Sequence, residues 1–338
     1  MVYAAQNSSG VKNLSDSQAS AQAIEGYDII GDIHGCASAL KTLLATLGYK
    51  ASSHTYLYPG HRRRLIFLGD FIDRGAEISE TLDIVHNAVK YADAIAIAGN
   101  HELSALLYFL NPKTLPKPFM HKSIQKQVKL TAEALAHSTK RQQAIIDWFQ
   151  QLPLFVDLGE FRIVHALWDP QLIDWFATKY QTNKLNPAFI RDWLSGDTTA
   201  STVINRLTRG LNLPCPEGIS IQGVDGVIRN SFRVKFWSET QPKTYQDIAF
   251  QPTPLPAELA KMPISASDST KLIYYSSKEK PLFVGHYWLQ GDLALVSKNI
   301  ACLDYSAVTG GKLVAYRYHL GDQGLDANRL VATELPSL

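Results

Sequence analysis

The chain has 338 residues, 46% of them hydrophobic and 19% charged, which is usual for a soluble globular protein. Its formal net charge is only +2, so bulk charge points neither to nucleic acid as a partner nor to a disordered acidic tail. The three cysteines are far apart and odd in number, which excludes a disulfide framework and favours a reducing compartment. No apolar run is long enough to span a membrane, and the N-terminus does not resemble a signal peptide. We therefore expect no membrane association and a cytoplasmic location, unless a secretion leader has been removed.

The first half of the chain has a repeating organisation. Residues 1–25 are rich in Ala, Ser, Asn and Gln, and we expect a flexible arm there, followed by a single domain over 26–330. A short apolar run, a glycine-framed polar block and a segment of helical spacing then follow one another three times. This repetition predicts βαβ units with a parallel sheet. The predicted strands are 27–30, 64–68 and 94–98, and the predicted helices are 36–48, 78–90 and one that starts near residue 103.

The remainder of the chain mixes helices with further strands. We expect two helices within 112–160 and largely helical structure over 170–210. Residues 211–270 hold many Pro, Gly and Ser residues and predict only short strands. Apolar runs predict additional strands at 161–165, 281–286, 293–297, 300–305 and 312–318.

Polar side chains follow several of these apolar runs at the point where each predicted strand ends. In open α/β sheets the carboxyl ends of the strands face the ligand crevice, so these side chains can converge at one place. A mixed set of carboxylate, imidazole and amide donors suits Mn, Fe or Zn better than Mg or Ca. Six donors are too many for one tetrahedral zinc, but they suit two metal ions about 3.5–4 Å apart that share a carboxylate. The six candidate ligands are Asp32, His34, Asp70, Asn100, His165 and His286.

The polar blocks also resemble those of a known family. GDIHG (31–35), GDFIDRG (69–75) and GNHE (99–102), followed by VHA (164–166) and GH (285–286), resemble the five motifs of the calcineurin-like metallophosphoesterases. The forms GNHE and GDxxDRG place the resemblance in the phosphoprotein phosphatase branch, and 301–317 resembles the closing segment of that branch. The resemblance spans 31–317, nearly the whole chain.

The resemblance implies a fold. We expect a four-layer α/β/β/α sandwich, in which two packed mixed β-sheets are flanked by helices. The first three motifs would belong to one sheet, and VHA, GH and the C-terminal strands would belong to the other. The ligands would then meet at one edge of the sandwich.

The resemblance also implies a role for each motif residue. Asp32 and His34 would hold one divalent metal ion, Asp70 would bridge both ions, and a hydroxide between the ions would attack phosphorus in line. His101 would donate a proton to the leaving oxygen, Asp73 would orient His101, and Arg74 would grip the phosphate oxygens. The second ion would be held by Asn100, His165 and His286.

The chain departs from the family pattern at two places. Leu167 and Trp168 follow VHA, and Tyr287 and Trp288 follow GH, where the family has small residues. These bulky groups predict a cleft that packs against an aryl ring, with Tyr287 and Trp288 in contact with the substrate. The branch also uses a further arginine on the phosphate, for which Arg229 and Arg233 are both candidates. The histidines outside the motifs, including His54, His61 and His86, are expected to be ordinary.

The expected function is that of a dimetal protein phosphatase that favours phosphotyrosine or aryl phosphates, acts on phosphoproteins or phosphopeptides, and is a monomer. A cysteine-based mechanism is excluded, because it needs Arg six residues after Cys. Three alternatives remain open: a dinucleoside polyphosphate hydrolase or phosphodiesterase of the same superfamily, an inactive phosphate-binding scaffold, and a metal-free binding module. The residues found six positions after Cys36, Cys215 and Cys302 are Thr42, Ile221 and Val308.

Overall fold

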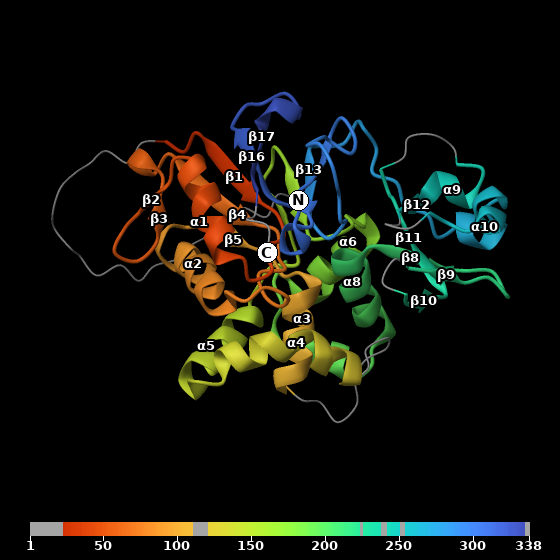
Figure 1. Cartoon of the computed structure of the whole chain (residues 1–338), viewed down its shortest axis with the longest axis horizontal. Helices are drawn as coiled ribbons and strands as arrows, with labels where there is room; N and C mark the ends of the chain where they lie inside the picture. The colour runs from red at the N-terminus through yellow and green to blue at the C-terminus, as the bar shows by residue number, and fades with distance from the viewer. Residues whose placement is uncertain (1–22, 111–120, 224–225, 238–241, 251–253, 335–338) are drawn as a thin grey trace.

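The computed structural model describes residues 23–110, 121–223, 226–237, 242–250 and 254–334 (Figure 1). Almost all of the predicted N-terminal arm lies outside the described residues, so that prediction stays untested. Two β-sheets pack face to face, and helices cover both outer faces. This is the four-layer sandwich of the predicted fold class.

The first sheet carries the first three motifs. Its strands lie in the order β15-β16-β1-β4-β5, and β17 also pairs with β16. β1, β4 and β5 are parallel, with Ile30 level with Phe67 and Phe67 level with Ala96, so their carboxyl ends lie at the same edge. The strands are β1 (Gly26–Ile30), β4 (Arg63–Phe67), β5 (Ile95–Ala96), β15 (Asp304–Tyr305), β16 (Lys312–His319) and β17 (Leu330–Glu334).

The second sheet has the order β14-β13-β7-β6, in which β13 is parallel to both β14 and β7. Because β7 and β13 run in the same direction, the residues that follow them also lie at one edge. The strands are β6 (Phe155–Asp157), β7 (Arg162–Val164), β13 (Leu282–Val284) and β14 (Ile300–Cys302).

Side chains along each strand alternate between two apolar clusters, one on each face of the first sheet. Ile29 and Ile66 are fully buried in a cluster with Phe161 and Phe283, and this cluster fills the space between the two sheets. Their neighbours on the opposite face, such as Phe67, belong to a second cluster that includes the helices. Successive strand residues point to opposite faces, so both faces of the first sheet are covered.

The long helices supply the two outer layers. α1 packs on β16 and β17, and α3 contacts α4, α5 and α8. Asp169 caps α6 by accepting a hydrogen bond from Leu172 N, and Pro170 occupies the first turn, where its missing N–H has no partner to lose. The helices are α1 (Ala37–Thr46), α2 (Ile78–Tyr91), α3 (Asn100–Leu110), α4 (His121–Leu135), α5 (Thr139–Phe149), α6 (Pro170–Tyr180), α7 (Pro187–Leu194) and α8 (Thr198–Arg209).

Three expectations about the C-terminal part were wrong. The strand at 312–318 forms as β16, but it lies in the first sheet, antiparallel to β1, rather than in the second sheet. The run 300–305 is divided between β14 in the second sheet and β15 in the first. Residues 293–297 form no strand; the only ladder contact there is an isolated bridge between Ser297 and Ile300.

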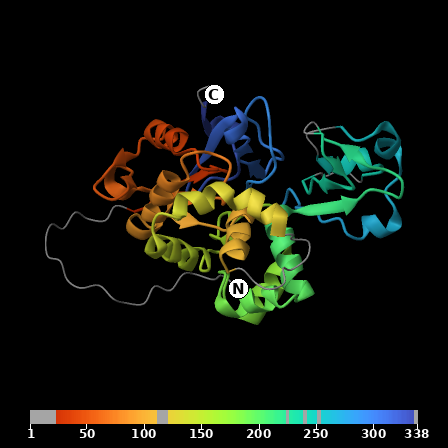
Figure 2. The same cartoon turned by 60° about the horizontal axis from the view of Figure 1, so that its bottom comes forward.

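The segment that the sequence left least defined forms a separate group of short elements beside α8 (Figure 2). Its three-stranded sheet has the order β12-β11-β8, and a two-stranded ribbon pairs β9 with β10. Phe232 and Val234 of β11 are buried, so the group has its own apolar contacts. The elements are β8 (Leu211–Pro214), β9 (Ile221–Gln222), β10 (Ile228–Arg229), β11 (Ser231–Val234), α9 (Tyr245–Ile248), β12 (Ala249–Phe250), α10 (Ala257–Lys261) and α11 (Ala266–Ser269).

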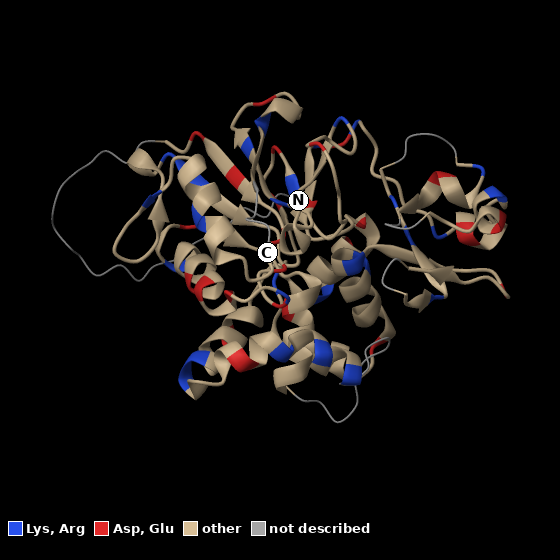
Figure 3. Ribbon diagram, in the orientation of Figure 1, with Lys and Arg blue, Asp and Glu red and all other residues tan. Residues whose placement is uncertain are grey.

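Charged residues are distributed over most elements of the chain. Lys and Arg occur together with Asp and Glu on many helices and loops in Figure 3. Within the described ranges, no helix combines the length and apolar character needed to cross a bilayer. A short ribbon and three 3₁₀ turns complete the structure: β2 (Lys50–Ala51), β3 (Tyr56–Leu57), η1 (Pro59–His61), η2 (Ala307–Thr309) and η3 (Ala327–Arg329).

Candidate active site

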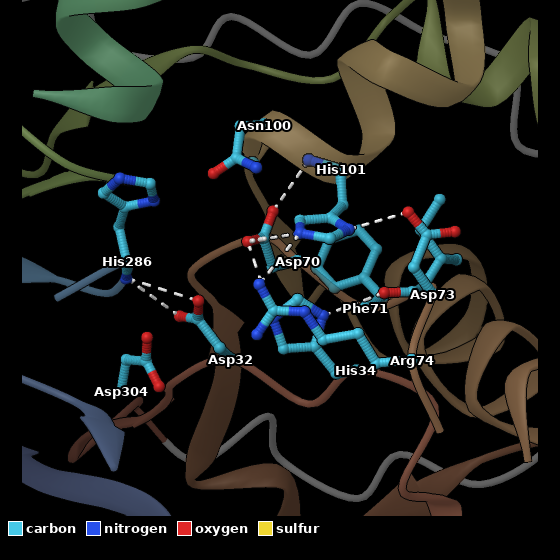
Figure 4. A network of polar contacts seen from close by, with 12 residues as sticks. Asp32, His34, Asp70, Phe71, Asp73, Arg74, Asn100, His101, His286 and Asp304 are labelled. Carbon is cyan, nitrogen blue, oxygen red and sulfur yellow. Dashed lines mark hydrogen bonds and ion pairs between the residues drawn. The ribbon is translucent and has the colours of Figure 1, made fainter. Parts of the chain in front are cut away.

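The six predicted ligands lie at the common carboxyl edge of the two sheets. Figure 4 shows Asp32, Asp70, Asn100 and His286 directed toward one another from different loops. The loops that follow β1, β4, β7 and β13 supply five of these side chains, and the first residue of α3 supplies Asn100. All six residues are buried, with relative exposures of 3% for Asp32, 3% for His34, 2% for Asp70, 5% for Asn100, 0% for His165 and 6% for His286.

Asp70 lies at the centre of the cluster. Its Oδ2 atom is 3.4 Å from His165 Nε2 and 3.7 Å from His34 Nε2. His34, Asp70 and His101 present ligand atoms within 4.8 Å of one another, and so do Asp70, His165 and His286. Asp70 is the residue common to both groups. The structure therefore brings together two possible metal-binding groups that share one carboxylate.

The hydrogen bonds of the histidines fix which ring nitrogen faces the cluster. His34 Nδ1 lies 2.9 Å from Ile72 O, and His165 Nδ1 lies 2.6 Å from Leu68 O. A carbonyl oxygen only accepts, so each Nδ1 carries a hydrogen and donates it. Nε2 is then the nitrogen left to bind a metal ion, and second hydrogen bonds of this kind orient histidine ligands in metal sites.

Four ligand atoms of the cluster have no hydrogen-bond partner among the described residues. They are His34 Nε2, His165 Nε2, His286 Nε2 and Asn100 Oδ1, of which the first two face Asp70 Oδ2 only at the longer distances of 3.7 and 3.4 Å. A buried polar atom without a partner costs about 1–3 kcal/mol, so four at one place need a common explanation. Divalent cations supply it, because each of these atoms is a metal ligand of the expected type. The residues present therefore fit the metal centre that the motifs imply.

The pKa values of the histidines in the cluster depend on burial and on the charged groups beside them. Burial alone lowers the pKa of His165, but the carboxylates of Asp70 and Asp32 raise it to about 10. Burial and the neighbouring His101 hold the pKa of His34 well below its ordinary value. Burial and Arg233 do the same for His286. The raised pKa favours the protonated form of His165 in the absence of a cation, and metal binding would compete with that proton.

The backbone of these loops is unusual. Five non-glycine residues of the motifs have positive φ angles: His34 (47°), Asp70 (52°), Asp73 (66°), Arg74 (67°) and His286 (63°). Such conformations cost energy for residues with a Cβ atom and are concentrated at functional sites. Gly285 permits a further close approach, because a Cβ atom there would lie 2.1 Å from Asp32 Oδ1. The chain accepts local strain in order to direct these side chains inward.

The predicted proton donor and its carboxylate form a close pair. His101 Nδ1 is 2.7 Å from Asp73 Oδ2, and Asp73 is fully buried. Thr131 of α4 holds Asp73 in place by donating to Oδ1 and accepting from the Asp73 N–H. Thr131 could not be predicted from sequence, because nothing marks a threonine in the middle of a helix as a partner of a motif residue.

The predicted phosphate-binding arginine lies beside this pair. The Arg74 guanidinium donates toward His101 Nε2 over 3.4 Å and stacks on the Trp288 ring, 5.1 Å from its centroid. Trp288 is 42% exposed, and so lies at the surface of the site. Arg74, His101 and Trp288 therefore form one wall.

The structure separates the remaining candidates. Tyr287 is fully buried and packs against Phe236, Trp237 and Phe250, so the prediction that it forms a cleft wall was wrong. Leu167 and Trp168 are also buried, at 1% and 6% exposure. Three of the four bulky residues thus belong to the core, and only Trp288 presents an exposed aromatic ring.

The two arginine candidates lie in different places. Arg233 donates to His286 O at 3.1 Å, and its Nε atom is buried without a hydrogen-bond partner in the described ranges. Arg229 lies on the β9–β10 ribbon, where its described hydrogen bond goes to Val227 O. Arg209, which the sequence did not suggest, donates to Ser104 Oγ at 3.3 Å, and its charge acts on Asp70. Arg233 is therefore the candidate that the structure brings to the cluster.

Glu102 is a further residue that the sequence analysis missed, although it is part of GNHE. Its carboxylate accepts hydrogen bonds from the N–H groups of Asp70, Phe71 and Gly99 at 2.8–2.9 Å. Burial and the charge of Asp70 raise the pKa of Glu102 to about 8, against the effect of these donors. Glu102 thus ties the loop after β4 to the start of α3.

We expect Glu102→Gln to destabilise the fold by about 1–3 kcal/mol, because the amide brings its own N–H groups against a backbone donor. Urea unfolding measures this difference. Glu80→Gln is the control, because Glu80 is a half-exposed residue whose ion pair with Lys41 lies at the surface, and it should change stability by less than about 1 kcal/mol. Equal stabilities of the two variants would contradict a structural role for Glu102.

The four-layer fold and a buried cluster of this composition define a metallophosphoesterase. The sequence profile described as calcineurin-like phosphoesterase matches residues 27–258, more than half of the chain, and the chain belongs to this family. It is a family of metal-dependent hydrolases.

Sequence relatives carry a more specific description. The chain is 32% identical over 143 residues to a bis(5'-nucleosyl)-tetraphosphatase PrpE [asymmetrical] of Oceanobacillus iheyensis, which is 41% of this chain and 54% of the relative. A protein of the same description from a Geobacillus species is 30% identical over 139 residues, 41% of this chain and 55% of the relative. The chain thus spans about half the length of the curated relatives it matches.

Solved structures give more distant matches. A putative diadenosine tetraphosphatase is 16% identical with a TM-score of 0.46, over 93% of this chain and 95% of that one. The cold-active protein-tyrosine phosphatase of a psychrophilic Shewanella species is 14% identical with a TM-score of 0.47, over 88% of this chain and 80% of that one.

Proposed function

We propose that the chain is a metal-dependent phosphomonoesterase that favours phosphotyrosine in proteins or peptides and other aryl phosphates. The observation that carries this proposal is the set of buried, unpartnered donor atoms around Asp70. Arg74, the His101–Asp73 pair and the exposed ring of Trp288 lie next to that set.

In this proposal two divalent cations occupy the cluster. Asp32 and His34 would hold one, Asp70 would be shared by both, and the donor set suits Mn, Fe or Zn. When bound, such a pair polarises the phosphoryl group and lowers the pKa of an attacking water. The second cation is held by Asn100, His165 and His286.

The protein groups then position and protonate the substrate. Arg74 presents two parallel N–H donors to phosphate oxygens, a geometry that favours bidentate binding. When the phosphate engages Arg74, His101 Nε2 no longer accepts from the guanidinium and can take up a proton from solvent water. That proton passes to the leaving oxygen, while Asp73 holds Nδ1 and so keeps Nε2 directed at the site.

Trp288 supplies the preference for aryl esters. Its exposed ring lies beside Arg74, so a phosphate bound by Arg74 places its ester group close to the indole. Aromatic pairs are worth about 0.5–1.5 kcal/mol beyond the area they bury. An aryl leaving group gains this contact, and a small alkyl group does not.

We expect Trp288→Ala to lower kcat/KM for aryl phosphates by about 2–10-fold, the equivalent of that contact energy, and to change alkyl phosphates less. Tyr91→Ala is the matched control, because Tyr91 is 47% exposed but lies at the far end of α2. Steady-state kinetics with phenyl phosphate and a short alkyl phosphate measure the difference. Equal losses for both esters would remove Trp288 from substrate selection.

A second candidate function is the hydrolysis of dinucleoside polyphosphates. The sequence relatives are described as bis(5'-nucleosyl)-tetraphosphatases, and the partly buried Arg233 adds a positive charge beside His286 that would suit a longer anionic substrate. In this case Trp288 would stack on a nucleobase in place of a phenyl ring.

One kinetic panel tests both candidates. The protein is stripped of metal, reloaded with Mn²⁺, and assayed on phosphotyrosine and phosphoserine peptides, p-nitrophenyl phosphate, its bis-ester and diadenosine tetraphosphate. The proposal expects turnover only with metal, and the highest kcat/KM on the aryl monoesters. Preference for diadenosine tetraphosphate would select the second candidate. A lack of metal-dependent turnover on every substrate would overturn both and favour a phosphate-binding scaffold.

A further inference from the structure

One acidic residue near the cluster is not part of the six-ligand set. Asp304 begins β15 and is 2% exposed. Its Oδ1 atom accepts a hydrogen bond from Ser306 N at 2.9 Å, whereas Oδ2 is buried and has no hydrogen-bond partner in the described parts of the chain. Oδ1 of Asp304 therefore stabilises a local turn, whereas no described contact accounts for the burial of Oδ2.

The fold places Asp304 next to Asp32. The loop after β1 passes directly over residue 303, and a Cβ atom at Gly31 would lie 2.0 Å from Leu303 O. Only glycine permits this approach, which brings the following Asp32 against the residue after Leu303. Figure 4 shows the two carboxylates facing each other below His286.

Three acidic side chains lie at this side of the site. Asp32, Asp70 and Asp304 are all buried, with relative exposures of 3%, 2% and 2%. Arg74 contacts His101 and the Trp288 ring, and Arg233 donates to His286 O, so neither guanidinium has a described ion pair with Asp32 or Asp304. Three buried carboxylates thus repel one another, and a buried charge of this kind requires a cation or a proton.

We propose that Asp304 belongs to the metal centre and directs its free Oδ2 toward the divalent cation held by Asp32 and His34. This inference rests on the proposed function. A third carboxylate on that side strengthens cation binding and makes the site more oxygen-rich. It therefore favours Mn²⁺ or Mg²⁺ over Zn²⁺ at this position.

A purely structural role predicts something different. If Asp304 only held the turn through Ser306 N, asparagine would do the same with its Oδ1 atom. Asp304→Asn keeps the shape and the turn and removes the charge. The two roles therefore predict different metal affinities for Asp304→Asn, but the same folding.

The test compares Asp304→Asn with Asp169→Asn. Asp169 is an equally buried carboxylate (4% exposed) that caps α6, and asparagine also caps helices. Each metal-free protein is titrated with Mn²⁺ and then with Zn²⁺ in competition with a fluorescent chelator, and bound ions are counted by elemental analysis. We expect Asp304→Asn to lose about 10–100-fold in Mn²⁺ affinity at one of two sites, with a smaller loss for Zn²⁺. Asp169→Asn should match the wild type.

The outcomes separate this inference from the proposed function. Wild-type affinities in Asp304→Asn would overturn the inference and leave the function standing. A wild-type protein that binds no divalent ions would instead overturn the proposed function. If Asp304→Asn folds poorly by circular dichroism, Asp304→Glu is measured in its place. If Asp304→Glu keeps the wild-type preference for Mn²⁺ over Zn²⁺, the result supports the role of the charge. If Asp304→Glu loses this preference although its charge is unchanged, the result contradicts that role.

Discussion

Asp70→Asn is expected to lower turnover by more than about 10³-fold, because the two cations that Asp70 would share supply several kcal/mol of transition-state stabilisation when bound. Its Oδ2 atom lies 3.4–3.9 Å from the Nε2 atoms of His165, His34 and His101, and it is the carboxylate common to both groups of possible ligands. The asparagine oxygen can still accept the N–H of His101, so the loop should keep its shape. The loss should therefore come from the missing charge.

Elemental analysis and turnover of p-nitrophenyl phosphate in excess Mn²⁺ measure this result together. We expect fewer ions per chain in Asp70→Asn than in the wild type, and two ions per chain in the control Asp169→Asn. Two ions in Asp70→Asn combined with normal turnover would contradict a bridging role for Asp70. If Asp70→Asn binds two ions but loses turnover, the charge of Asp70 is needed for the reaction and not for metal binding.

The site could be predicted from sequence because its residues follow apolar runs within short motifs. Asp32, Asp70 and Asn100 each lie a few residues beyond a parallel strand, and parallel strands bring their carboxyl ends to one edge. Partners that come from other elements could not be predicted in this way. Thr131 is 58 residues from Asp73 in sequence, and only the packing of α4 brings them together.

The aromatic prediction failed at Tyr287 for a related reason. A bulky residue after a ligand motif is compatible with both an open wall and a buried core position. The segment from 236 to 250 decides between them, because Phe236, Trp237 and Phe250 cover the Tyr287 ring. That segment is the part of the sequence with the weakest periodicity, so its contacts were not predictable.

The sheet assignment failed because burial on both faces removes the pattern that distinguishes sheets. In β16, Leu313 and Ala315 face the helix side while Val314 and Tyr316 face the second sheet, which gives a continuous apolar run. Such a run fits either sheet equally well. In 293–297, Leu293 and Leu295 pack against the core between the sheets without ladder partners, so an alternating pattern arose without a strand.

His101→Asn is expected to slow the hydrolysis of esters with poor leaving groups by about 10²–10⁴-fold, the usual effect of losing a proton donor. Esters of p-nitrophenol should be affected much less, because that leaving group departs without a proton. The measurement is kcat/KM for a series of aryl and alkyl phosphates plotted against the pKa of the leaving alcohol. The slope should become steeper in the variant. His86→Asn is the control, because His86 is a half-buried histidine that packs on Trp148 outside the cluster.

The metal content of His101→Asn decides between two roles that the geometry of His101 permits. His101 presents a ligand atom within 4.8 Å of those of His34 and Asp70, and histidine ligands often bond a carboxylate through their second nitrogen, as His101 does with Asp73. A proton donor can be removed without loss of ions, whereas removal of a ligand lowers the number of ions per chain. We expect wild-type metal content together with the steeper slope. Loss of one ion, with equal losses across all leaving groups, would make His101 a ligand and leave the leaving oxygen without an identified donor.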